Sequence, residues 1–263
     1  MKKNSERIEK MAGIWKNKYS SIVEPQEIFT VLIAAAGSGQ RMGGVYKPLS
    51  DVAGEPMLVY SLRAFQKNGF VKQIVISAPE DRMTELMQLG KLYGITKLRA
   101  VVAGGNTRAD SVVNAFRAAF DKKENITPFL AIHDAARPMI TTEILDKLFF
   151  ECVRHGSAVC ATKLRDAIKK AGNDLVATEI LDREGIWQMQ TPQAFDTDIY
   201  HTALATLGKD NISNAHDDAA IVMKAGFKCF LVETGFSNFK ITYPEDLELA
   251  TLILKARKEA QNG

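Results

Sequence analysis

The amino-acid sequence predicts an α/β protein with a doubly wound, mostly parallel sheet and a projecting β-arm. Two observations predict the sheet. Short apolar or β-branched runs alternate with amphipathic helical patterns, and small polar residues follow several runs where a strand should end. A third observation predicts the arm, because charged and turn-prone residues interrupt the alternation at residues 164–190.

Each expected element has its own pattern. Strands are expected at residues 30–36, 73–78, 99–103, 129–133 and 157–163. Helices are expected between them at residues 57–67, 82–93, 109–122 and 143–153. Pro56 suits a first helical turn, and Thr141 or Thr142 suits an N-cap. Regular packing should resume after the arm at residues 194–207, 217–225 and 228–232, with a last helix from Pro244.

Composition excludes several classes of protein. The chain has 263 residues, of which 46% are hydrophobic, and its net charge of +3 gives no basic footprint for nucleic acid. No apolar run approaches the roughly 18 residues of a membrane span. Cys152, Cys160 and Cys229 lack metal-ligand spacing. We therefore expect small buried thiols and a cytoplasmic location.

Residues 1–27 differ from the rest and are expected to form an extension to a domain covering residues 28–263. They are polar and lysine-rich, without the apolar core of a signal peptide. Ile8, Met11 and Trp15 fall on a helical stripe. Two interpretations remain open: a short helix that packs on this chain or on a partner subunit, and a frayed tail.

The most informative segment is VLIAAAGSGQRMGGVYKP, residues 31–48. An apolar run passes into the small residues 37–39, and Arg41 and Lys47 follow. Glycines let backbone N–H groups approach phosphate oxygens, and the cations offset phosphate charge. The segment therefore predicts a phosphate-binding loop with Arg41 and Lys47 near a triphosphate. The alternative is a plain strand-to-helix turn with solvated charges.

Two better-known phosphate loops are excluded at this position. A dinucleotide fingerprint needs a third glycine where Met42 stands. A P-loop needs Gly-Lys-Ser/Thr, but Val45 follows Gly44.

Two further loops follow predicted strands. In HDAARP, residues 133–138, Asp134 follows a buried strand, where a carboxylate can hold Mg²⁺ against nucleotide phosphates, and Arg137 is a candidate fork for an anionic substrate. In GGNTRADS, residues 104–111, glycines permit close backbone approach and small polar side chains can read a base edge. The alternatives are an aspartate cap with a surface arginine, and a helix N-terminus capped by Asn106.

The three loops, in this order and spacing, resemble the 2-C-methyl-D-erythritol 4-phosphate cytidylyltransferases of the non-mevalonate isoprenoid pathway. The resemblance covers about residues 28–255 and includes DREGIW at 182–187, QTPQAF at 190–195, DDA at 217–219 and NFKITYPEDL at 238–247. It implies a Rossmann-like nucleotidyltransferase fold and a reaction that uses CTP, a sugar-alcohol phosphate and Mg²⁺ or another divalent cation. It also implies a homodimer joined by arms at about residues 164–190.

The resemblance also implies roles for individual residues. The catalytic cations are Arg41, Lys47 and Lys240, and the metal-associated residue is Asp134. The nucleotide-binding residues are Ala35, Gly37, Ser38, Gly39, Gly105, Asn106, Ser111 and Ala135. The residues near the substrate phosphate are Arg137, Ala167, Arg183, Thr191 and His216, with Arg183 reaching the partner subunit's site.

Some positions depart from the family pattern. Ala167 and His216 stand where the family commonly has threonine, and Asn106 stands where aspartate is common. Losing one hydroxyl removes a hydrogen bond that contributes about 0.5–1.5 kcal/mol. We hypothesise that His216 restores a donor that Ala167 has lost.

The implied reaction is attack of a phosphomonoester oxygen on the α-phosphorus of CTP, with pyrophosphate leaving. The attacking phosphate is already anionic near neutral pH, since its second pKa is about 6. Catalysis then depends on positioning and charge stabilisation. The alternatives are a ribitol-5-phosphate cytidylyltransferase, a sugar-1-phosphate nucleotidyltransferase using UTP or dTTP, and a non-catalytic nucleotide-binding relative.

Overall fold

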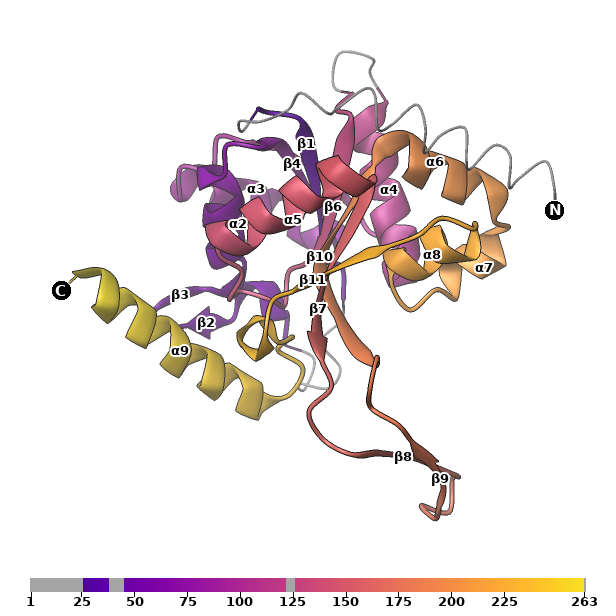
Figure 1. Ribbon diagram of the computed structural model, residues 1–263. Coiled ribbons are helices and arrows are strands. Elements are labelled where there is room, and N and C mark those ends of the chain that lie inside the picture. The colour runs from indigo at the N-terminus through magenta and orange to yellow at the C-terminus, as the bar shows by residue number, and fades with distance from the viewer. Residues whose placement is uncertain (1–25, 38–44, 122–125, 263) are drawn as a thin grey trace.

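A seven-stranded sheet forms the centre of the computed structural model, which describes residues 26–37, 45–121 and 126–262 (Figure 1). Its strand order is β11-β7-β10-β6-β1-β4-β5. In chain order these strands are β1 Phe29–Ala34, β4 Val71–Ala78, β5 Leu98–Ala103, β6 Phe129–Asp134, β7 Ser157–Lys163, β10 Trp187–Asp196 and β11 Phe230–Glu233. Neighbouring strands are parallel except at β10, which runs antiparallel to β6 and β7. The predicted α/β class with a mostly parallel sheet is confirmed.

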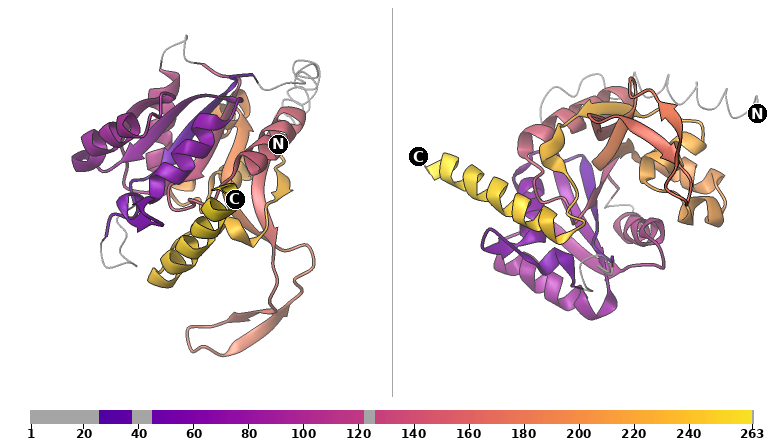
Figure 2. Two further views of the ribbon diagram at one scale, coloured as in Figure 1. Left: turned by 90° about the vertical axis from the view of Figure 1, so that its left-hand side faces the viewer. Right: turned by 90° about the horizontal axis from the view of Figure 1, so that it is seen from below.

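Helices cover both faces of this sheet (Figure 2). One face packs against α2 Met57–Lys67, α3 Met83–Leu92 and α5 Thr142–His155. The other packs against α4 Arg108–Phe120, α6 Thr197–Thr206 and α8 Asp218–Lys224. Val31 and Ile33 of β1 face the first layer, whereas Leu32 faces the second. Burial on both faces explains why the central strands are continuous apolar runs.

The helix starts follow local capping chemistry. Thr141 caps α5, as one of the two predicted threonines, and its hydroxyl accepts from the Ile144 N–H. Thr107, and not Asn106, caps α4, in a box with Asp110. A threonine with an acidic residue three positions later fixes the first turn of a helix.

A third apolar cluster lies beneath the sheet. It joins Val52 of β2 Asp51–Val52 to Ala250 and Leu254 of the final helix α9 Pro244–Asn262, and β2 pairs with β3 Glu55–Pro56. The described part of the chain also contains short helices: η2 Lys47–Leu49, η3 Glu80–Arg82, α7 Lys209–Ser213 and η5 Phe236–Asn238. Among the described residues, no helix is long and apolar enough to cross a membrane.

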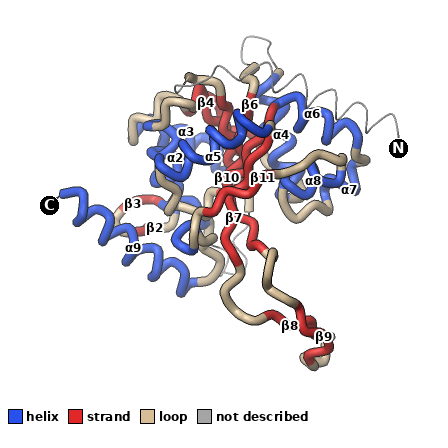
Figure 3. Tube along the Cα trace, in the orientation of Figure 1, coloured by secondary structure: helices blue, strands red, loops and turns tan. Residues whose placement is uncertain are grey.

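The predicted arm is a two-stranded antiparallel hairpin, β8 Ile168–Ala171 with β9 Ala177–Leu181. It extends from β7 and β10 away from the body of the molecule (Figure 3). Every residue of β9 is exposed, and Leu175 in the hairpin turn is 88% exposed. The arm therefore has almost no packing within its own chain.

The largest difference from expectation is β10. Sequence analysis treated residues 194–207 as one packed segment, but they contain the end of β10 followed by α6. The strand was hidden because it contains three glutamines and Pro192, which weaken a strand pattern. Gln190 and Gln193 are buried there with hydrogen-bond partners. The expected helical stripe of residues 8–15 lies outside the described residues.

Candidate active site

The three predicted loops meet at the carboxyl edge of the sheet. Ala34 of β1 is in register with Asp134 of β6, and Ala78 of β4 with Ala103 of β5. Since these strands are parallel, the loops that follow them leave the same edge. At Gly104 an added Cβ would lie 2.4 Å from the Ala36 Cβ. The loop after β5 therefore needs glycine to pack against the loop after β1.

Asp134 is the centre of a buried charge cluster at this edge. Arg108 Nε donates to its Oδ1 at 2.8 Å, and Lys240 Nζ donates to its Oδ2 at 2.8 Å. Burial alone would raise the pKa of the Asp134 carboxyl. The charges of Arg108 and Lys240, with the Lys240 hydrogen bond, outweigh burial and hold that pKa well below its usual value. Asp134 is therefore a carboxylate at neutral pH.

Lys47 joins the same region through the segment that carries Lys240. Its Nζ donates to the Thr242 carbonyl at 3.0 Å and to the Ile241 carbonyl at 3.4 Å. Two cations separated by almost 200 residues of sequence thus meet on one segment, and Lys240 of that segment contacts Asp134. Such an arrangement suits a ligand with several negative charges.

Sequence analysis assigned no role to Arg108, although it stands inside the quoted 104–111 loop. Its guanidinium bridges Asp134 and Asp218, with Nη1 donating to Asp218 Oδ2 at 2.8 Å. Burial by itself would lower the pKa of the Arg108 guanidinium, but the charges of Asp218 and Asp134 raise it by more. The pKa of Arg108 is therefore above its usual value. The sequence did contain one sign that Arg108 is paired. A cation at the start of a helix is unfavourable in the field of the helix dipole, so a carboxylate partner is expected.

The loop before α4 uses its small residues to fix its own shape. The Gly105 N–H donates to the Ser111 hydroxyl at 2.9 Å, and that hydroxyl donates to the Thr107 carbonyl at 2.9 Å. An added Cβ at Gly105 would lie 2.4 Å from the Asp110 Cβ. Asn106, in contrast, is exposed. Ser111 therefore shapes the loop from inside, and Asn106 is available to a ligand.

His133, Thr191 and Arg137 form the floor of the site. The Thr191 hydroxyl accepts from the Asp134 N–H at 3.0 Å and lies 3.2 Å from His133 Nδ1. His133 is fully buried and also contacts Ser61 Oγ and the Arg137 carbonyl. Arg137 Nη1 donates to the Asn238 carbonyl at 2.7 Å. These contacts fix the turn that presents Asp134.

Comparisons with known proteins agree with this geometry. A family profile described as "IspD: 2-C-methyl-D-erythritol 4-phosphate cytidylyltransferase" matches residues 29–256. The chain belongs to this family. A Chlorobaculum tepidum protein named 2-C-methyl-D-erythritol 4-phosphate cytidylyltransferase is 35% identical, over 87% of this chain and 97% of the relative.

Two further relatives extend the comparison. The bifunctional enzyme IspD/IspF of Desulfotalea psychrophila is 35% identical, and the match covers 87% of this chain but only 57% of that protein. The crystal structure of the Thermus thermophilus 2-C-methyl-D-erythritol 4-phosphate cytidylyltransferase superposes with a TM-score of 0.68 at 28% identity. That match covers 86% of this chain and 98% of the other. The predicted family resemblance is therefore confirmed.

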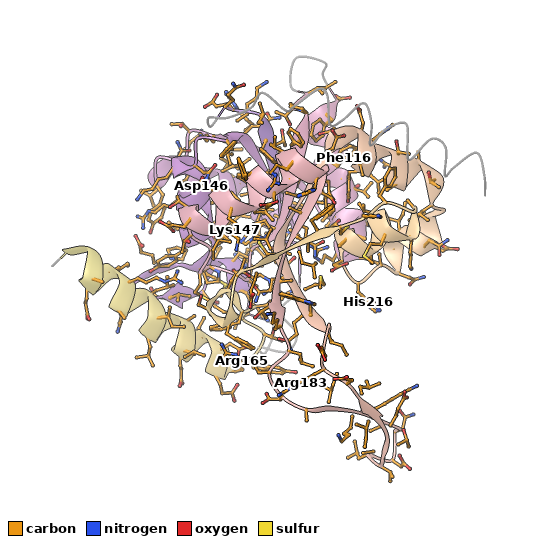
Figure 4. The ribbon with its side chains drawn as sticks, viewed as in Figure 1. Phe116, Asp146, Lys147, Arg165, Arg183 and His216 are labelled. Carbon is orange, nitrogen blue, oxygen red and sulfur yellow. The ribbon has the colours of Figure 1, made fainter. Side chains whose placement is uncertain are left out.

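Not all residues matched to the family pattern meet within one chain. Arg183 lines a hollow of about 680 Å³ at the base of the arm, together with Lys163, Asp182 and Trp187. Ala167 is also on the arm and exposed, whereas His216 is exposed just before α8. Figure 4 shows Arg183 on the arm and His216 beside the body. Among the described contacts, none joins Arg183 or Ala167 to Asp134, whereas His216 stands two residues before Asp218, which Arg108 joins to Asp134.

The first loop is described only in part. Ala35 is buried, and its N–H donates to the Ser77 carbonyl at 2.8 Å. Ala135 is buried too, and its N–H donates to the Ala34 carbonyl at 3.1 Å. An added Cβ at Gly37 would meet no described atom within 4 Å. Ser38, Gly39 and Arg41 lie outside the described residues, so their roles stay predictions.

The family pattern implies a divalent cation, and the residues at Asp134 fit one. Mg²⁺ is commonly held by one or two carboxylates together with substrate phosphates. The described residues contain no cluster of three His, Cys, Asp or Glu side chains that could hold a metal alone. Asp134 offers an ionised carboxylate, and each of its oxygens accepts one hydrogen bond. A carboxylate has about four lone-pair sites, so capacity remains for a cation.

Proposed function

We propose that this chain joins CTP and 2-C-methyl-D-erythritol 4-phosphate to give 4-diphosphocytidyl-2-C-methyl-D-erythritol and pyrophosphate. One observation carries the proposal: in a chain that matches the cytidylyltransferase family over residues 29–256, Lys240 and Arg108 both contact Asp134 at the carboxyl edge. This edge is where open α/β sheets bind ligands.

The reaction forms one bond and breaks another. An oxygen of the sugar-alcohol phosphate attacks the α-phosphorus of CTP, and the bond from that phosphorus to the pyrophosphate oxygen breaks. The attacking phosphate is largely ionised near neutral pH, so no side chain has to remove a proton. What the chain must supply is alignment and positive charge.

Individual residues supply this alignment and positive charge. Lys47 and Arg41 stabilise the charge that builds on the α-phosphate and the leaving pyrophosphate. Lys240 bridges the nucleotide and the substrate. Gly37 and the small residues after it accommodate the triphosphate, and the loop with Gly105 and Asn106 faces the base. Fixed cations are effective here because they need no reorientation during the reaction.

Asp134 would hold the divalent cation. A bound cation supplies Lewis-acid stabilisation of phosphoryl oxygens. Lys240 already contacts Asp134 Oδ2, so its ammonium stands beside the position where nucleotide charge would collect.

We also propose that the active unit is a homodimer in which Arg183 of each arm reaches the partner subunit's site. Three features support it: the arm has almost no packing of its own, Leu175 and Ile180 on it are 88% and 80% exposed, and Arg183 lies at its base. Arg137, Thr191, Ala167 and His216 remain candidates for the pocket of the substrate phosphate. A cytoplasmic location is part of the same proposal, supported by three free cysteines.

Pyrophosphate release tests the function. Purified chain with CTP and Mg²⁺ should release pyrophosphate with 2-C-methyl-D-erythritol 4-phosphate and not with ribitol 5-phosphate. UTP and dTTP should be poor replacements for CTP. Release with ribitol 5-phosphate alone would contradict the proposed substrate. CTP binding without release on either substrate would favour a non-catalytic nucleotide-binding protein.

A further inference from the structure

We propose that Asp218 and Tyr200 are positioning residues for the transfer reaction. Through Arg108 they hold the Asp134 carboxylate in the orientation that receives the nucleotide and its cation. The inference rests on the proposed function. It assigns a role to two side chains behind the site, on the helices α8 and α6.

A continuous chain of short contacts carries the proposal. The Tyr200 hydroxyl donates to Asp218 Oδ1 at 2.8 Å. Arg108 Nη1 donates to the other oxygen, Asp218 Oδ2, at 2.8 Å. Arg108 Nε then donates to Asp134 Oδ1 at 2.8 Å. Each link is charge-assisted, and charge-assisted hydrogen bonds are the stronger class.

Burial makes this chain rigid. Asp218 and Tyr200 are fully buried, whereas the Arg108 side chain is 26% exposed. A buried carboxylate must have its oxygens satisfied, because an unpaired buried charge is strongly unfavourable. Both Asp218 oxygens are satisfied by the two donors named above. Asp218 is therefore a fixed acceptor that sets the orientation of the Arg108 fork.

The two cations on Asp134 differ in how firmly they are held. The Lys240 side chain is 39% exposed and hangs on a flexible stem, and the proposed function requires it to engage phosphates. Arg108 is held from behind by a second carboxylate and presents a planar fork. When Lys240 engages a phosphate, Arg108 still orients Asp134. The structure thus separates a partly exposed cation that contacts Asp134 from a cation held between two carboxylates.

A second contact ties the same loop to the same layer of helices. Ser213 of α7 donates its hydroxyl to Asp110 Oδ1 at 2.9 Å. Asp110 belongs to the capping box that starts α4, and Arg108 is the first residue of that helix. The start of α4, which follows the base-facing loop, is therefore held by two contacts with the helices packed against it: Asp218 of α8 binds Arg108, and Ser213 of α7 binds Asp110.

The test uses two variants of the full chain and two matched controls. Asp218→Asn removes the charge that holds Arg108, and Tyr200→Phe removes only the hydroxyl. Asp196→Asn is the control for the first, because Asp196 is a buried aspartate that caps α6. Tyr60→Phe is the control for the second, because the Tyr60 hydroxyl donates to the Val52 carbonyl at 2.7 Å.

Two readouts separate positioning from general stability. The first is Mn²⁺ binding in the presence of CTP, followed by the electron paramagnetic resonance signal of free Mn²⁺, with no sugar phosphate present. The second is the Mg²⁺ concentration that gives half-maximal pyrophosphate release. Circular dichroism and thermal unfolding check that each variant is folded.

We expect Asp218→Asn to weaken Mn²⁺ binding by about 10- to 100-fold, the range for lost partners of metal-ligating side chains. Tyr200→Phe should weaken it several-fold, and both controls should stay within about twofold of the unaltered chain. The Mg²⁺ requirement should rise in the same order. If Asp218→Asn does not fold, the Mn²⁺ binding of Tyr200→Phe tests the positioning role by itself.

Folded variants with unchanged Mn²⁺ binding and Mg²⁺ requirement would overturn the proposal. So would losses of equal size in the controls, since they would indicate a general effect on folding. An unaltered chain that binds Mn²⁺ with CTP but transfers nothing to 2-C-methyl-D-erythritol 4-phosphate would instead contradict the proposed substrate, and the Mn²⁺ measurement would still test the positioning role.

Discussion

The carboxyl edge of the sheet and the β-arm use their charged residues in opposite ways. At the edge, Asp134 is buried and each of its oxygens has a cationic donor from a distant part of the sequence. On the arm, Arg183 is exposed and donates to the main-chain oxygen of Arg165. The carboxylate at the edge is paired within one chain, whereas the arm presents groups that the described part of this chain does not cover. The difference indicates where a second subunit would contribute.

The largest effect is expected at the edge. Lys240→Ala should lower the turnover number by about 10²–10³, the scale for loss of one preorganised donor. Lys258→Ala is the matched control, because Lys258 of α9 pairs with Glu55 of β3 and not with Asp134. Steady-state pyrophosphate release measures both. Near-normal turnover in Lys240→Ala would show that the edge cluster is not the catalytic centre.

A smaller effect is expected on the arm. Arg183→Ala should lower kcat/KM for the sugar phosphate by roughly 10- to 100-fold, since hydrogen bonds to charged groups contribute about 1.5–3 kcal/mol. The KM for CTP should change little. Lys170→Ala is the control, because Lys170 is also on the arm and pairs only with Glu179 at 3.5 Å among the described ion pairs. Equal losses in the two variants would argue against a specific role for Arg183.

The packed body, unlike the arm, buries ionisable side chains, so its stability should depend on pH. Burial raises the pKa of the Cys229 thiol to about 12. The unfolded chain releases the thiol proton at lower pH than the folded chain does. The protonated Cys229 thiol therefore makes its full contribution to folding stability below the pKa of the unfolded state, and this contribution is lost as pH rises towards 12. Between pH 8 and pH 10 the unaltered chain should lose roughly 1.5 kcal/mol more than Cys229→Ala. Urea unfolding at both pH values measures the difference. Parallel losses in the two chains would refute it.

The smallest effect is expected for apolar residues of the arm in the isolated chain. Leu175→Ser should change the free energy of unfolding by less than about 0.5 kcal/mol, because Leu175 is 88% exposed. Leu62→Ala is the comparison in the packed body, where Leu62 is fully buried and truncation should cost about 2–5 kcal/mol. Urea unfolding at protein concentrations where the chain is monomeric measures both. A large loss in Leu175→Ser would mean that the arm packs on its own chain.

Much of the fold was predictable from the sequence. Strands buried on both faces are continuous apolar runs, so β1, β4, β5, β6 and β7 were found within a few residues of their bounds. The helix α2 has the bounds predicted from periodicity. The strand β10 was not found, because its buried glutamines are satisfied by partners elsewhere in the chain. Gln193 Nε2, for example, donates to Asp217 Oδ2 at 3.0 Å.

The candidate site was predictable in outline only. An aspartate after an apolar strand and cations after a glycine loop are local signals, and they led to Asp134 and Lys47. The pairing of Arg108 with Asp218 joins residues 110 positions apart, and no local pattern reports it. The arm raises the same difficulty, because its partner groups would belong to another copy of the chain.

Mixing two impaired variants tests most directly whether the edge works within one chain and the arm works on the partner. Lys240→Ala and Arg183→Ala chains are purified, mixed in equal amounts and allowed to exchange subunits. If each arm serves the partner's site, half of the dimers hold one site with both residues, and about one quarter of the unaltered activity should return. If each arm serves its own site, every site lacks one of the two residues. Absence of any recovery in mixtures shown to contain mixed dimers would contradict the account.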